Sequence, residues 1–181
     1  MSEDSSPARE PGRLGALLER GARLLALAGG VCLVFIIVLT GASIAGRAML
    51  TLGLGFGPVP GDYELVEIAA GVAVFLFLPL CHLKRGHVTV DILARWFGRR
   101  GVAATDLVGN LLMALAASVI LWRLVAGLQD KLRTGEESFI LGIPLWGSYA
   151  LSLVGAASFV LVCLYALHRS WAETAVADGK A

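Results

Sequence analysis

The run "ELVEIAAGVAVFLFLPLCHL", residues 64–83, carries no acidic or basic side chain between Glu67 and His82 and has the length of a membrane span. A helix of about 20 mainly apolar residues crosses the hydrocarbon core of a bilayer. The whole chain shares this character, because 57% of its 181 residues are hydrophobic and 16% are charged. Soluble domains have about 45–50% and about 25%, respectively. The sequence therefore predicts an integral membrane protein.

Further apolar runs on both sides of this one predict three more spanning helices. The four spans are expected at about 24–46, 64–83, 107–127 and 143–167. A cleavable signal peptide is the competing interpretation of the first run, because "SIA" at 43–45 resembles a cleavage site. Its apolar run exceeds the roughly 7–15 residues of a signal core, and this favours an uncleaved helix.

The segments outside the spans are polar or rich in glycine and proline. "TLGLGFGPVPGDY", residues 51–63, predicts a loop, because it cannot continue a helix. The expected fold is all-α, with one four-helix membrane domain over residues 13–170. Residues 1–12 are expected to form a disordered tail and residues 171–181 a C-terminal tail.

A polar stretch after the 64–83 run predicts a short amphipathic helix at about 90–100. Asp91, Arg95 and Arg99 form one stripe of this helix, and Trp96 lies roughly opposite. Such a helix is expected to lie along the cytoplasmic membrane surface, with Trp96 at headgroup level. Trp96, Arg95 and Arg99 are therefore the expected interfacial anchors.

The lysines and arginines that flank the spans predict the orientation. The N-terminal segment, the 84–105 loop and the C-terminal tail together hold eleven of the fifteen cations. The other side holds the remaining four, which are Arg47, Arg123, Lys131 and Arg133. Because cytoplasmic loops carry the excess of basic residues, both termini are expected in the cytoplasm.

Four ionisable residues are expected at membrane depth near the outer rim: Arg47, Glu64, Glu67 and Arg123. Ionisable groups in lipid are costly and usually face protein, so each one is a candidate functional residue. A cluster of Arg47, Glu67 and Arg123 would pair these charges. The alternative is that each side chain reaches the headgroups independently.

His87 lies four residues before Asp91, and a hydrogen bond between them is expected to fix the turn before the surface helix. Neither a nucleophile nor a second acid lies nearby, so no catalytic residue is predicted. A metal site built from Cys81, His82, His87 and Asp91 fits no standard spacing. His82 and His168 could hold a haem in a redox anchor, and this remains an alternative reading.

Composition and cysteines exclude further classes of function. The net charge of +1 gives no reason to expect a nucleic-acid partner. The three cysteines each lie within an apolar run and form no metal-ligand spacing. We therefore expect no metal site and no cofactor in this chain.

Three segments together resemble the small membrane subunit, the DctQ-like family, of tripartite ATP-independent periplasmic (TRAP) transporters. They are Arg47 at the end of the first span, "YELVEIAAGVAVFLFLPLCHLKRGHVTVDIL" across the second, and "GIPLWGSYALSLVGAA" at the start of the fourth. The second segment is the most specific, since it joins Glu64 and Glu67 to the Gly86–His87 pair and Asp91. The resemblance covers about residues 20–170.

The resemblance implies a multi-pass protein of the bacterial inner membrane, with a scaffold role and no substrate-binding residues. It implies two protein partners: a large membrane subunit and a periplasmic substrate-binding protein that captures an organic acid anion. Sodium coupling is expected in the large subunit, and membrane lipid is the remaining partner. By the same resemblance, Arg47, Glu64, Glu67, His87, Asp91 and Arg123 are structural or interaction residues. The alternatives are a haem- or quinone-associated redox anchor and an oligomeric carrier.

Overall fold

The computed structural model describes residues 13–84 and 91–178, with side chains described within 14–84 and 106–171. The chain forms four long helices in these ranges. They are α1 (Arg13–Thr51), α2 (Asp62–Leu83), α3 (Asp91–Thr134) and α4 (Trp146–Asp178). All four contain a span long and apolar enough to cross a membrane, so the expected all-α membrane fold is confirmed.

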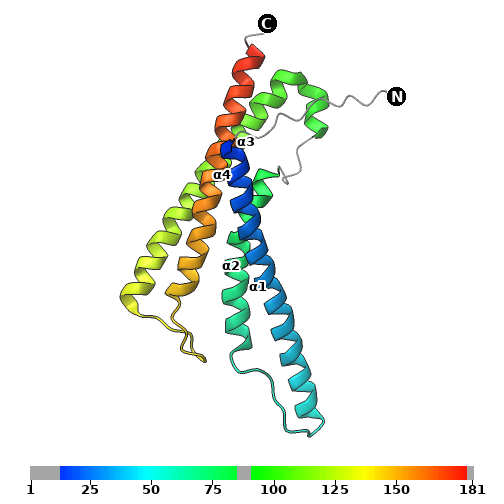
Figure 1. Ribbon diagram of the computed structural model, residues 1–181, viewed down its shortest axis with the longest axis vertical. Coiled ribbons are helices and arrows are strands. Elements are labelled where there is room, and N and C mark those ends of the chain that lie inside the picture. Colours follow the sequence, from blue (N-terminus) through cyan, green and yellow to red (C-terminus); the bar gives the residue numbers. More distant parts are fainter. Residues whose placement is uncertain (1–12, 85–90, 179–181) are drawn as a thin grey trace, which may run out of the picture.

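The helices follow one another in space in the order α3, α4, α2, α1, an arrangement that we call the layer (Figure 1). Extensive contacts join α3 to α4, α4 to α2, and α2 to α1, and α1 touches α4 only slightly. Within the described residues, α3 makes no contact with α1 or α2. The edge helices α1 and α3 are therefore exposed over most of their surface, with many large apolar side chains uncovered.

The two ends of this layer differ. The first residues of α1 and the last of α4 lie at one end, which we call the terminal end (Figure 1). The connections 52–61 and 135–145 lie at the opposite end, which we call the loop end (Figure 1). In Figure 1 the α1–α2 pair and the α3–α4 pair diverge toward the loop end.

Small residues allow close contact between the two central helices. A Cβ atom on Gly155 of α4 would lie 2.5 Å from the carbonyl oxygen of Phe75 in α2, so only glycine fits at this crossing. Nearby, Ala114 and Ala117 of α3 pack against Phe159 and Cys163 of α4, and these four side chains form a buried apolar cluster. These contacts position α4 between its two neighbours.

The helices extend beyond the predicted spans. α1 begins at Arg13, before the first predicted span at about 24–46, and α3 joins the expected surface helix to the third span without a break. The first part of α3 turns away from the line of the remainder (Figure 1). α4 begins at Trp146 instead of 143, because Ile143 and Pro144 pair with the chain before them in the 135–145 connection.

Candidate functional site

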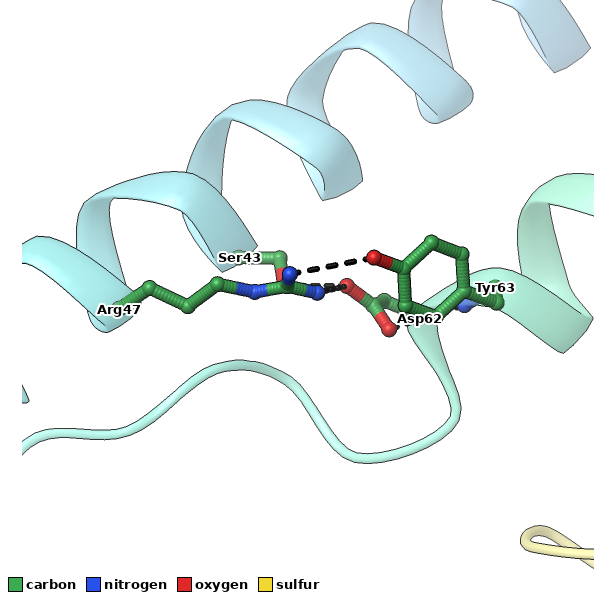
Figure 2. A network of polar contacts seen from close by, with 4 residues as sticks. All are labelled: Ser43, Arg47, Asp62 and Tyr63. Carbon is green, nitrogen blue, oxygen red and sulfur yellow. Dashed lines mark hydrogen bonds and ion pairs between the residues drawn. The ribbon is translucent and has the colours of Figure 1, made fainter.

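An ion pair joins α1 to α2 at the loop end. Arg47 Nη2 lies 2.9 Å from Asp62 Oδ2, and the Asp62 side chain is 12% exposed (Figure 2). The same carboxylate oxygen accepts a hydrogen bond from Ser43, which is buried one helical turn before Arg47. Two groups from α1 therefore hold one carboxylate of α2.

Tyr63 completes this cluster, which we call the α1–α2 clamp (Ser43, Arg47, Asp62 and Tyr63). Arg47 Nη1 donates to the Tyr63 hydroxyl over 3.1 Å, and the guanidinium carbon lies 5.3 Å from the ring centroid (Figure 2). A guanidinium at this distance from an aromatic ring is attracted by the ring face. The arginine is thereby held between a carboxylate and a ring, which fixes the spacing of α1 and α2.

The start of α2 explains why Asp62 is in place. Gly61 adopts φ = 72°, a left-handed conformation that favours glycine, and ends the loop. Asp62 begins the helix, and its Oδ1 accepts a hydrogen bond from the Tyr63 backbone N–H over 2.9 Å. A carboxylate here is also favoured by the positive end of the helix dipole. Asp62 thus serves the helix start and the ion pair together.

Glu64 forms the second polar link of the loop end. It accepts hydrogen bonds from the backbone N–H groups of Ile140 and Leu141 over 2.9 and 3.2 Å, respectively. These amides belong to the connection between α3 and α4, so one carboxylate of α2 holds a segment more than 70 residues away in the chain. The α2–hairpin link (Glu64, Ile140, Leu141) ties together the two diverging helix pairs.

The held segment, residues 135–145, is a short hairpin. Ser138 N–H donates to the Ile143 carbonyl over 2.9 Å, and Leu145 N–H donates to the Glu136 carbonyl over 3.0 Å. An ion pair between Lys131 and Glu136 fixes the hairpin to the end of α3. Phe139 at its tip is fully exposed. The hairpin is therefore a defined structure that displays an apolar side chain at the loop end.

The predicted cluster of Arg47, Glu67 and Arg123 is not formed. Arg47 pairs with Asp62 instead, because Glu67 follows Asp62 by five residues and so lies about 140° around the helix. Glu67 and Arg123 are both exposed, and neither makes a hydrogen bond or ion pair with the residues that the structure describes. Arg47 and Glu64 both lie at the loop end, where Arg47 pairs with Asp62 and Glu64 accepts from the hairpin amides. Their location at the membrane rim stays a prediction.

The side chains of the remaining predicted residues are not described. His87 is outside the described residues, and Asp91, Arg95, Trp96 and Arg99 lie in α3 where only the backbone is described. Their predicted roles stay predictions.

The two histidines of the redox reading lie near the terminal ends of α2 and α4. His82 is buried with its ring edge-on to Phe159, at 5.8 Å between centroids, whereas His168 is exposed. Among the side chains within 14–84 and 106–171, no three histidine, cysteine, aspartate or glutamate residues gather as metal ligands would. Asp62 and Glu64 hold helices and a loop together, and this is a structural use of charge.

Ser43, Asp62 and Tyr63 were not predicted as site residues. Asp62 and Tyr63 close the stretch that was predicted as a loop, although an acidic residue directly after a glycine is a common helix start. Ser43 lies four residues before Arg47, so a shared helix face was visible in the sequence. The groups that bind Glu64 are backbone amides, so the pattern of side chains in the sequence could not indicate them.

The comparisons with known proteins agree with the resemblance. Residues 36–173 match the family model of the DctQ component of tripartite ATP-independent periplasmic transporters. Neither a curated protein nor a solved structure gives a significant match. The match includes the α1–α2 clamp, the α2–hairpin link and most of the four spans. The chain therefore belongs to the DctQ family and is a multi-pass small membrane component of a tripartite ATP-independent periplasmic transporter.

Proposed function

We propose that this chain is a non-catalytic scaffold for the large membrane subunit of its transporter. In this proposal, the large subunit takes up an organic acid anion together with sodium, and a periplasmic binding protein delivers the anion. This chain supplies neither the substrate site nor the sodium site. It gives the large subunit a fixed neighbour in the membrane.

The observation that supports this proposal most strongly is how the spans are built and held. Each described span is one continuous helix, whereas carriers typically build their midplane substrate sites from broken helices. At the loop end, Asp62 and Glu64 are both engaged in linking one part of the layer to another. Charges used in this way favour a rigid support over a moving carrier.

Transport in proteoliposomes tests the scaffold role. The expected result is uptake of a labelled carboxylate only when this chain, the large subunit, the binding protein and an inward sodium gradient are all present. The panel of substrates would include C4-dicarboxylates, keto acids and sialic acid. Flux through vesicles that contain this chain alone would support the oligomeric carrier instead. An absorption band of bound haem in the purified chain would support the redox anchor.

We further propose that the protein lies in the bacterial inner membrane with both termini in the cytoplasm and the loop end outside. The distribution of eleven against four cations supports this orientation. In a variant without Cys32, Cys81 and Cys163, Phe139→Cys should react with an impermeant maleimide in intact cells. The matched variant Lys84→Cys should react only after the membrane is permeabilised. The reverse pattern would show the opposite orientation.

The terminal-end residues complete the proposal. Arg95, Arg99 and Trp96 anchor the first part of α3 at the lipid surface, and His87 and Asp91 shape the turn that precedes it. Tryptophan fluorescence of single-Trp variants, with lipids brominated at chosen depths, tests this placement. Quenching of Trp96 near the headgroups is expected, and a Trp96 that only aqueous quenchers reach would contradict it.

A further inference from the structure

We propose that one exposed face of α2 receives a transmembrane helix of the large subunit, with an arginine or lysine of that helix opposite Glu67. This face, which we call the α2 face, consists of Tyr63, Glu67, Gly71 and Val74. The proposal rests on the proposed function and adds to it the surface of contact and the chemistry of the partner.

The α2 face is open although α2 lies inside the layer. Its four residues are spaced by four, four and three, so they follow one side of the helix. Tyr63 is 70% exposed and Val74 is 58% exposed, and Glu67 and Gly71 are exposed as well. Other parts of the α2 surface are covered where α1 and α4 contact it, and the buried residues of α2 include Val72, Ala73, Leu76, Pro79 and His82. The chain itself therefore leaves one side of its central helix uncovered.

Glu67 indicates which kind of chemical group covers the α2 face. The other two acids at the start of α2 are satisfied within the chain, Asp62 by Arg47 and Glu64 by the amides of the hairpin. Glu67 has no hydrogen bond or ion pair among the residues that the structure describes. It lies five residues, or about 7.5 Å along the axis, inside the helix from Asp62. A charge at such a position faces protein and finds a partner there.

The length of the side chain strengthens this argument. Arg123 is also exposed without a described partner, but an arginine reaches the headgroups by extending its long stem. The glutamate stem is shorter, so its carboxylate reaches the headgroups less readily than a guanidinium does. Glu67 therefore requires a cationic or strongly donating group from another protein.

Gly71 supplies the space for a close approach. A Cβ atom there would meet no atom within 4 Å, so none of the residues that the structure describes fills the position. Small residues on a membrane helix allow another helix to approach its backbone closely. Gly71 lies one turn from Glu67, so one incoming helix would meet both residues. A helix of the large subunit fits this combination of close packing and charge.

Co-purification of tagged chain with the large subunit tests the proposal. Gly71→Leu should abolish recovery of the large subunit, because the new side chain fills the contact. The control is Gly41→Leu on α1, where an added Cβ likewise meets nothing within 4 Å and where we propose lipid as the neighbour. The control variant should recover the large subunit as the unchanged chain does.

The variant Glu67→Leu distinguishes a loss of docking to the large subunit from a loss of the chain's own folding stability. Since Glu67 holds nothing within the described chain, its removal should leave the melting temperature of the isolated chain unchanged or raised, while recovery of the large subunit falls severalfold. Melting at a clearly lower temperature would mean that Glu67 stabilises this chain itself, and the proposal would be overturned.

A photo-crosslinking residue in place of Val74 identifies the occupant directly. The expected product joins this chain to the large subunit, whereas the same residue in place of Val34, exposed on α1, should give no such product. Products at Val74 that contain only lipid or a second copy of this chain would overturn the proposal. If the unchanged chain recovers no large subunit at all, the proposed function fails. If the unchanged chain recovers the large subunit and both Gly71→Leu and Glu67→Leu recover it as well as Gly41→Leu does, only the proposal about the α2 face fails.

Discussion

Arg47 and Asp62 face each other between α1 and α2, with 2.9 Å between Nη2 and Oδ2. The pair is unequal, because the Arg47 side chain is 47% exposed and the Asp62 side chain only 12%. Removal of the arginine leaves a largely covered carboxylate that only Ser43 and a backbone amide satisfy. An unpaired charge in this position destabilises more than an exposed ion pair stabilises.

We predict that Arg47→Leu lowers the melting temperature of the detergent-solubilised protein by about 2–4 °C or more. Arg133→Leu, which removes an exposed cation from the last turn of α3, should leave it unchanged. The double variant of Arg47→Leu with Asp62→Asn should lose little more than Arg47→Leu alone, since the two residues act as a pair. Additive losses would contradict the pairing.

The α2–hairpin link predicts a local change. Glu64→Ala should leave the hairpin held by its own hydrogen bonds and the Lys131–Glu136 ion pair, so the amides of Ile140 and Leu141 should exchange hydrogen severalfold faster. Hydrogen–deuterium exchange read by mass spectrometry measures this change. Amides in the middle of α4 serve as the internal control. Unaltered exchange at 140 and 141 would show that Glu64 does not hold the hairpin.

The crossing of α2 and α4 predicts a packing defect. Gly155→Ala forces a Cβ atom within 2.5 Å of the Phe75 carbonyl oxygen, and the two backbones must separate. A cost of about 1–3 kcal/mol is expected from overpacking of this kind. Gly147→Ala is the matched control on the same helix, since nothing lies within 4 Å of the added atom. Equal unfolding free energies for the two variants in a detergent titration would argue against the close crossing.

A hydrogen bond joins α3 and α4 toward the terminal end. Asn110 Nδ2 donates to Ser170 Oγ over 2.6 Å, and Ser170 is 3% exposed. Asn110→Ala should lower the free energy of unfolding by about 0.6–2 kcal/mol, the range of such bonds in membranes. Ser170→Ala added to it should cost little further. A double-variant cycle with no coupling would contradict this bond.

The sequence predicted the four spans, because apolar runs of bilayer length admit few other structures. It also predicted Arg47 and Glu64 as polar residues of one rim. The partners were harder to predict. Asp62 was read as part of a loop, since the boundary of a helix depends on a backbone angle, here at Gly61, that is weakly encoded.

The order of the helices could not be predicted from pattern. The four spans are mostly apolar, so none shows a clear apolar stripe that would tell which face meets a neighbour. The order instead depends on individual close contacts such as Gly155 against Phe75. A single glycine among 22 gives no indication of such a role until its neighbour is known.

Each edge helix has one main neighbour, and this has a consequence for the protein in the cell. α1 is held mainly by α2, and α3 by α4 alone within the described residues, so the outer side of each edge helix is left open. A copy made in excess of the large subunit would therefore leave its edge helices α1 and α3 accessible to membrane proteases. We expect cells to keep the abundance of this protein matched to that of the large subunit by destroying the surplus.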